Sequence, residues 1–222
     1  MKKTLLLIFS LLIFSQLYAT HNRAGEITYR QIGALTYEIT VTTYTKADAP
    51  ADRCEIEIDW GDDSFSILPR INGPAGGNGC PHMGVIVNNQ IKKNVYVGQH
   101  TFPANGTYIL KMLDPNRNEG VLNISNSVNV PFYIQSIIKI GIGLGNNSSP
   151  VLLNPPTDFG CVNTPYIHNV AAYDADGDKL KFEVLGLPPG AEFKDNEDGT
   201  GLFGLREGQR QQGGVLPPDP HL

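Results

Sequence analysis

Alternation of apolar and polar residues is the feature that most restricts the fold of this chain. Apolar residues stand at positions 35, 37, 39 and 41, with Thr or Glu between them, and residues 54–60, 108–112 and 128–134 repeat the pattern. Successive side chains of a strand point to opposite faces, so each stretch is predicted to be a half-buried antiparallel strand. Four strands that each have one apolar face need a facing layer, which predicts a β-sandwich.

The composition and the turn-rich stretches divide the chain. Its 222 residues include 24 Gly and 16 Pro, which favours strands and turns over helices. Residues 70–90 have many Gly, Asn and Pro and are predicted to form a long loop. Residues 141–150 are the best candidate linker, because the pattern restarts after them. We therefore predict one domain over 20–140, a second over 151–203 and an irregular tail over 204–222.

The amino terminus has the pattern of an export signal. Lys2 and Lys3 precede an apolar run over 5–14, and Ala19 is a small residue before the expected cleavage site. Residues 1–19 are thus predicted to be a signal peptide, and the mature protein to be secreted or on the cell surface. The apolar run is too short to span a membrane, and no later segment approaches that length. A net charge of −5 argues against a nucleic-acid partner, which requires a basic surface.

The chain has three cysteines, an odd number for an oxidising compartment. A disulfide between Cys54 and Cys80 is the favoured pairing, which leaves Cys161 without a partner. The sequence also allows two alternatives. Cys54, Cys80 and His82 could bind zinc, or both cysteines could be free.

An acidic run with alternating carboxylates lies in the second predicted domain. Asp174, Asp176 and Asp178 surround a turn residue, Gly177. Oxygen ligands at this spacing suit calcium if the backbone curves around the ion, so we predict a calcium site here. The helix-loop-helix calcium motif does not fit, because its turn glycine and closing Glu are replaced by Lys and Leu. Alternation over 179–184 predicts a strand directly after the run; the alternative is a solvated acidic turn.

Two motifs of the first domain resemble the polycystic-kidney-disease (PKD) domain, an immunoglobulin-like sandwich. They are Asp59-Trp-Gly-Asp-Asp63, at the end of a predicted strand, and His100-Thr-Phe-Pro-Ala-Asn-Gly-Thr-Tyr108, which leads into another. The resemblance implies that Trp60 anchors the core and that Gly61 and Asp62 form a tight hairpin turn. Asp63 replaces the usual Gly of the family, and Asp tolerates the left-handed conformation better than most residues.

A broader resemblance covers about residues 20–185. The stretches that carry it are 20–30, 93–98, 114–118 and 126–134. They look like the amino-terminal part of large surface proteins of Bacteroidetes, which combine PKD-like and cadherin-like modules with a gliding-motility-associated sorting domain. This implies an exported, adhesin-like protein that uses type IX secretion. The sorting domain itself is not visible in this sequence.

The second domain is similar to cadherin-like and immunoglobulin-like modules of bacterial surface proteins. The acidic run before an expected strand, together with Leu187-Pro-Pro-Gly-Ala191, carries this similarity. In such modules calcium lies near a domain junction, which again indicates Asp174, Asp176 and Asp178. Residues 151–203 are short for a whole sandwich, so we expect this module to be incomplete.

These observations predict an all-β protein of two immunoglobulin-like modules that acts as a non-catalytic adhesion or scaffold module. Its ligand would be a protein or a polysaccharide. The alternative is an accessory region of an extracellular carbohydrate-active enzyme, in which PKD-like modules also occur. Acid–base catalysis by Asp59 with Asp62 or Asp63 is disfavoured, because carboxylates in a hairpin turn usually face solvent. His21, His100 and His168 are interpreted as structural or surface residues.

Overall fold

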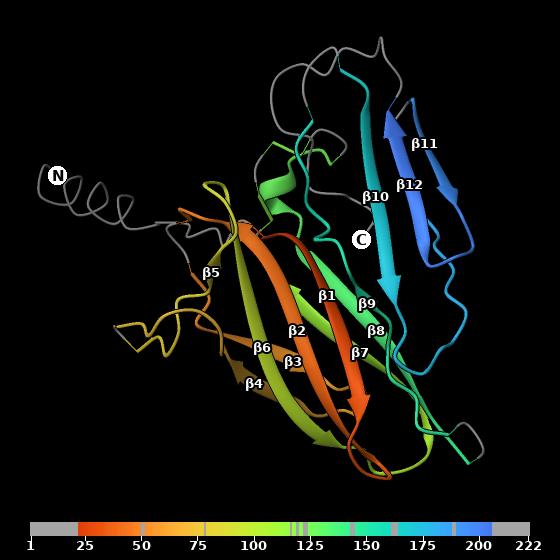
Figure 1. Ribbon diagram of the computed structural model, residues 1–222. Coiled ribbons are helices and arrows are strands. Elements are labelled where there is room, and N and C mark those ends of the chain that lie inside the picture. Colours follow the sequence, from red (N-terminus) through yellow and green to blue (C-terminus); the bar gives the residue numbers. More distant parts are fainter. Residues whose placement is uncertain are drawn as a thin grey trace, which may run out of the picture.

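The computed structural model describes residues 22–49, 52–77, 79–115, 117–118, 120–121, 124–142, 145–160, 164–187 and 190–205. It is almost entirely β, with three antiparallel sheets, and this confirms the predicted all-β class (Figure 1). Within the described ranges the only helix is the short 3-10 helix η1 (Ser127–Asn129). No helix in these ranges is long and apolar enough to cross a membrane. The predicted signal peptide, His21, Cys161 and residues 206–222 lie outside the described residues.

Two of the sheets face each other and form a sandwich (Figure 1). The first has the order β1-β2-β6-β5 and consists of β1 (Asn22–Gln31), β2 (Thr36–Lys46), β6 (Ile91–Thr101) and β5 (Val85–Ile86). The second has the order β4-β3-β7-β8 and consists of β4 (Phe65–Pro69), β3 (Glu55–Asp59), β7 (Gly106–Asp114) and β8 (Phe132–Ile140).

The hydrophobic core lies between these two sheets. The inward positions of β2 are almost fully buried, as the alternation predicts, and β3 and β7 contribute Ile58 and Leu110 to the same cluster. Trp60, at the end of β3, is 1% exposed. The apolar faces of β2, β3 and β7 therefore point to the core, because burial against a second layer removes them from water.

Two sequence predictions for the sandwich need correction. Strand β8 begins at Phe132, whereas the alternation predicts a strand from Val128; the residues before it form η1, which follows Asn126 in the left-handed conformation (φ 54°). Local i to i+3 hydrogen bonds thus replace the ladder there. The loop predicted over 70–90 includes the two-residue strand β5, which pairs with β6.

The third sheet follows the sandwich in the chain. Its order is β11-β12-β10-β9, with β11 (Ala191–Asp195), β12 (Thr200–Leu205), β10 (Tyr166–Tyr173) and β9 (Val151–Leu152). The strand predicted over 179–184 is wrong: the Phe182 amide donates to Asp195 Oδ2, and no strand is formed. Alternation alone cannot supply the ladder partner that a strand requires. The irregular tail predicted from Gly204 is also corrected, since β12 continues through Leu205.

The segment between the sandwich and the third sheet is bound to β1. The amide of Ser149 donates to the Tyr29 carbonyl at 2.9 Å, and the Tyr29 amide donates to Ser149 Oγ at 2.8 Å. Three residues later, the Leu152 amide donates to Glu26 Oε2 at 3.2 Å. Leu152 also pairs with Ala172 of β10. The carboxy-terminal end of the predicted linker therefore connects the edge of one sheet to the next, instead of running free.

Candidate functional site

The Trp-Gly-Asp-Asp motif forms the turn between β3 and β4. Asp59 Oδ1 accepts a hydrogen bond from the Gly61 amide at 2.8 Å. Gly61 has φ 79°, and a Cβ atom at this position would lie 2.6 Å from the Ile109 carbonyl oxygen of β7. Only glycine meets both conditions without strain. Asp63 has φ 65°, so it occupies the left-handed conformation where the PKD family has Gly.

His100 connects this turn to the core. Its ring stacks on Trp60 with the ring centroids 4.6 Å apart, and its Nε2 lies 2.7 Å from Asp62 Oδ2. Asp62 Oδ1 accepts hydrogen bonds from the amide and the hydroxyl of Ser64. Burial alone would raise the pKa of Asp62, but the hydrogen bonds from Ser64 and His100 outweigh it and lower the pKa. Asp59, Asp62 and His100 therefore stabilise the turn between β3 and β4.

A disulfide joins Cys54, immediately before β3, to Cys80 in the long loop. Because both sulfurs are bonded to each other, neither is a zinc ligand in this structure. The third residue of the zinc alternative, His82, has its Nδ1 3.2 Å from the Gly73 carbonyl oxygen. Cys80 is 7% exposed and Cys54 is half-buried.

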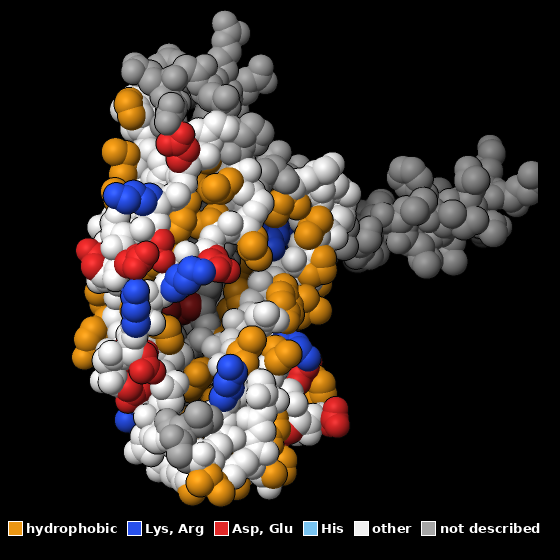
Figure 2. Space-filling view, turned by 90° about the vertical axis from the view of Figure 1, so that its right-hand side faces the viewer, with side chains coloured by type: hydrophobic (Ala, Val, Ile, Leu, Met, Phe, Trp, Pro, Cys, Tyr) orange, Lys and Arg blue, Asp and Glu red, His pale blue; other side chains and the backbone are white. Residues whose placement is uncertain are grey.

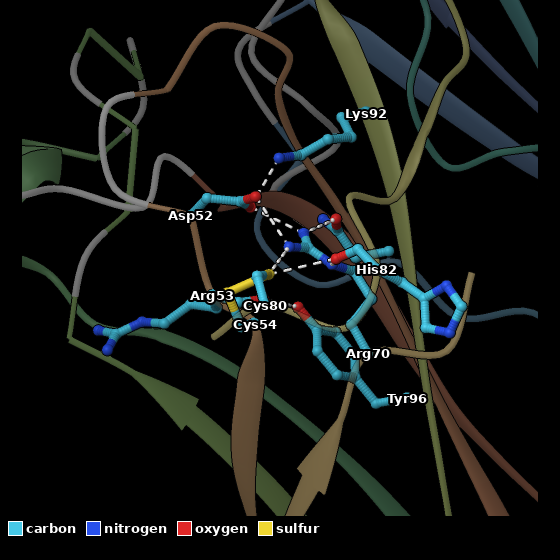
Figure 3. Close-up of a disulfide and its surroundings, with 9 residues drawn as sticks. Asp52, Arg53, Cys54, Arg70, Cys80, His82, Lys92 and Tyr96 are labelled. Carbon is cyan, nitrogen blue, oxygen red and sulfur yellow. Dashed lines mark hydrogen bonds and ion pairs between the residues drawn. A yellow bond between two sulfur atoms is a disulfide. The ribbon is translucent and has the colours of Figure 1, made fainter. Parts of the chain in front are cut away.

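Arg70 lies beside this disulfide and is absent from the residues that the motifs predict. Its side chain is fully buried, and its guanidinium donates to both carboxylate oxygens of Asp52 at 2.8 Å. It also donates to Asn94 Oδ1 at 2.7 Å, to the His82 carbonyl at 2.8 Å and to Cys80 Sγ at 3.0 Å (Figure 3). One side chain thus joins the start of β3, strand β6 and the long loop.

Lys92 completes this group, which we call the arginine cluster: Asp52, Arg70, Lys92 and Asn94 with the disulfide. Lys92 Nζ lies 2.6 Å from Asp52 Oδ1, and the Lys92 side chain is 7% exposed. Burial alone would raise the pKa of Asp52, but hydrogen bonds from Arg70 and Lys92 outweigh it and lower the pKa. The carboxylate is therefore held ionised between two buried cations.

A sequence signal for Arg70 does exist. Leu68 is the buried residue of β4, and Arg70 follows it at the same phase, so it points inward. A charged residue at an inward position requires a partner, because an unpaired buried charge is very costly. Which residue serves as that partner depends on the tertiary fold, since Asp52 and Asn94 are distant in sequence.

The acidic run of the third sheet forms a local turn. Asp174 is 6% exposed, and its Oδ1 accepts hydrogen bonds from the amides of Asp176 and Asp178 at 2.9 and 3.1 Å. Asp176 Oδ2 accepts the Ser148 amide of the segment that binds β1, and Gly177 has φ 82°. The run therefore lies at the junction between the sandwich and the third sheet.

Calcium binding at these three carboxylates stays a prediction. No group of three His, Cys, Asp or Glu side chains in the described part of the chain is placed to hold a metal ion. Backbone amides donate to Asp174 Oδ1 and Asp176 Oδ2, so a cation would have to share these two oxygens with them. This arrangement resembles the alternative of an acidic turn, with backbone donors instead of an ion.

Comparisons of this chain with protein-family models, with curated proteins and with solved structures found no match.

Proposed function

We propose that this chain is an exported, non-catalytic adhesion or scaffold module of the cell surface, in which a PKD-like sandwich is followed by a cadherin-like unit. The observation that carries the proposal is the junction around Tyr29 and Ser149. Reciprocal hydrogen bonds there, with the bond from Leu152 to Glu26, attach the second unit to an edge strand of the first. A protein that transmits force or spaces ligands benefits from such a fixed junction, whereas a flexible linker leaves domains independent.

The chemistry of the polar residues supports a non-catalytic role. Asp59 and Asp62 stabilise one turn, Asp62 together with His100 of β6, and the Asp174 carboxylate caps another turn. Groups that serve a reaction converge on a substrate, whereas these are directed at their own backbone or at each other. Acidic and basic side chains are intermixed on the face shown in Figure 2, which suits a protein or polysaccharide ligand better than a nucleic acid.

Export is the second part of this proposal. The disulfide supports it, because such bonds persist in oxidising compartments. Mass spectrometry of the protein recovered outside the cytoplasm tests it, with a mature amino terminus near Thr20 as the expected result. A soluble cytoplasmic product that retains Met1 would contradict export.

Calcium belongs to this proposal through the resemblance to cadherin-like modules. Binding at Asp174, Asp176 and Asp178 requires the carboxylates to converge and to release backbone amides that they now accept. We therefore expect any calcium effect to be local to the junction.

The adhesive role is tested with beads that carry the purified chain. Retention of the beads is measured on surfaces coated with polysaccharides or with extracellular proteins, and hydrolysis of the same polysaccharides is measured in parallel. Beads that carry the reduced and heat-unfolded chain are the control. We expect retention without turnover. Turnover of a polysaccharide by the folded chain would refute the non-catalytic role.

A further inference from the structure

The guanidinium of Arg70 has an acceptor for each of its five N–H groups. Four of these acceptors are oxygens, supplied by Asp52, Asn94 and the His82 carbonyl. The fifth is Cys80 Sγ, at 3.0 Å from Nη2. Sulfur is a weak acceptor, whereas a thiolate would accept a charge-assisted hydrogen bond from the same donor. The fifth donor is thus already in position for an anionic form of Cys80.

The net charge of the arginine cluster also favours an anionic form of Cys80. Two buried cations, Arg70 and Lys92, share one carboxylate, that of Asp52, so one positive charge is in excess. An uncompensated buried charge is costly, and a thiolate at Cys80 would neutralise it. Asn94, the other member of the cluster that contacts the guanidinium, is neutral.

Other polar groups near the disulfide do not supply the missing negative charge. Arg53 is paired with Asp114. Burial raises the pKa of the Tyr96 phenol, which donates to the Arg53 carbonyl. The His82 ring is turned away from the disulfide, as Figure 3 shows. The His82 carbonyl oxygen lies 3.2 Å from Cys80 Sγ and would favour a neutral thiol, but it is a dipole and the two cations are full charges.

The two cysteine residues also differ in exposure. Cys54 is half-buried, whereas Cys80 is 7% exposed and its sulfur lies against Arg70. In thiol–disulfide exchange the nucleophile attacks the accessible sulfur, and the sulfur with the more stable thiolate leaves faster. We propose that Cys54–Cys80 is an exchangeable disulfide, at which an external thiolate attacks Cys54 Sγ and Cys80 leaves as a thiolate bound to Arg70.

The step is balanced without an added oxidant. The attacking thiolate forms a new S–S bond with Cys54, the Cys54–Cys80 bond breaks, and its electron pair stays on Cys80. The negative charge thus moves from the external thiolate into the arginine cluster. The product carries a mixed disulfide at Cys54, so the site would capture a thiol-bearing molecule covalently and release it when Cys80 attacks in return.

Ultraviolet titration of the thiolate tests the leaving group. In the full chain with Cys161→Ser, a further Cys54→Ser change leaves only Cys80, and Cys80→Ser leaves only Cys54. Folding of both variants is checked by circular dichroism. We expect Cys80 to ionise at least about one pH unit below the ordinary midpoint of roughly 8.5, and Cys54 at or above that midpoint. The opposite order, or an ordinary midpoint for Cys80, would overturn the proposal.

A charge substitution separates this role from a structural one. Lys92→Met removes the excess positive charge of the cluster, and Lys93→Met makes the same change of net charge on the opposite face of strand β6. In glutathione redox buffers we expect the disulfide of Lys92→Met to be about tenfold harder to reduce than that of Lys93→Met. If Lys92 served only stability, its loss would loosen the site and ease reduction. Equal or easier reduction would therefore overturn the proposal.

The site of the mixed disulfide provides an independent measurement. The wild-type chain is equilibrated with reduced glutathione at a low molar ratio of glutathione to protein. It is then quenched with acid and digested, and the modified peptides are identified by mass spectrometry. We expect glutathione on Cys54. Glutathione on Cys80, or none at either position while the disulfide opens, would overturn the proposal irrespective of how the substituted chains fold.

Discussion

The sandwich and the third sheet are made from the same kind of strand but have different interiors. A hydrophobic cluster of 16 buried residues fills the space between the two sheets of the sandwich. In the described part of the third sheet, the buried apolar side chains are Val170, Ala171 and Phe203, and none of them belongs to that cluster. Ile167 is 67% exposed and Leu185 is 78% exposed. The first region has two layers, whereas the third sheet has one.

Alternation of apolar and polar residues creates an apolar face but does not determine what covers it. The sandwich covers its apolar faces with each other, so burial stabilises both sheets at once. Between the third sheet and the sandwich, hydrogen bonds run through Ser148 and Ser149 of the connecting segment and through Leu152 of β9. We therefore expect most of the folding free energy of this chain to reside in residues 22–140.

Separation of the two regions should give the largest effect. Limited proteolysis of the folded chain is expected to remove residues from the carboxy-terminal side and to stop near 141–152, leaving a resistant fragment that contains the disulfide. A fragment over 20–150 should unfold cooperatively, while one over 151–205 should not, because an uncovered face forfeits about 25 cal/mol per Å². Cooperative unfolding of 151–205 alone, measured by circular dichroism, would contradict the difference between the regions.

The same contrast can be made with single substitutions. Trp60→Ala removes a ring that is 1% exposed, stacks on His100 and donates to Ser66 Oγ at 2.9 Å. We expect it to lower the free energy of unfolding by about 3–5 kcal/mol. Phe203→Ala is the matched change in the third sheet, where Phe203 is 8% exposed. Because Trp60 is the only tryptophan, urea denaturation of both variants is followed by circular dichroism. In the Phe203→Ala chain, tryptophan fluorescence additionally reports on the sandwich and should show little change. An equal loss of stability in the two variants would contradict the contrast.

The parts of the fold that the sequence predicts are those that depend on local pattern. The alternation of β2 and β3 places Ile39 and Ile58 on the buried face. A shift of the pattern by one residue would have placed them on the opposite face. Trp60 lies in the core, as its motif implies, and Asp63 adopts the left-handed turn. The boundary of β8 is less accurate, since the left-handed Asn126 starts a turn that alternation does not reveal.

The parts of the fold that the sequence does not predict depend on residues that are distant in sequence. Apolar and polar residues alternate over 179–184, yet this segment forms no strand, because a strand needs a neighbouring strand with free backbone groups. The arginine cluster joins Asp52, Arg70 and Asn94 from three separate segments, and no linear motif connects them. In the acidic run, the Asp174 carboxylate accepts amides of its own turn, and Asp176 accepts the amide of the distant Ser148.

The stability of the two regions should also respond differently to acid, and this effect should be smaller. The pKa of Asp62 is lowered in the folded state, so its contribution to stability is complete above the unfolded value of about 3.9 and is lost as the pH falls through the lowered pKa. Asp52 has the same sign. At pH values below about 4, we expect the melting temperature of the sandwich to decrease. Asp62→Asn should flatten this decrease.

Asp195 provides the control for acid in the third sheet. Its pKa is also lowered, by the backbone amides of Glu197 and Phe182, but the residue is only half-buried and lies far from the sandwich core in sequence and in the sheet order. Asp195→Asn is expected to leave the acid transition of the sandwich unchanged. An equal effect of the two substitutions would show that the acid limb does not report on the Trp60 turn.

Calcium should have the smallest effect, and only at the junction between the two regions. Free calcium at about ten times its dissociation constant would add roughly 1.4 kcal/mol to the unit that binds it. Asp176→Asn removes a charge but retains an oxygen that can accept the Ser148 amide, so it tests the ion and not the hydrogen bond. Differential scanning calorimetry in chelator and in millimolar calcium should show a shift that Asp176→Asn abolishes and Asp198→Asn, in another turn, preserves. Identical melting in chelator and in calcium, with the chain folded, would mean that the backbone amides already satisfy this run and that the junction is held by hydrogen bonds alone.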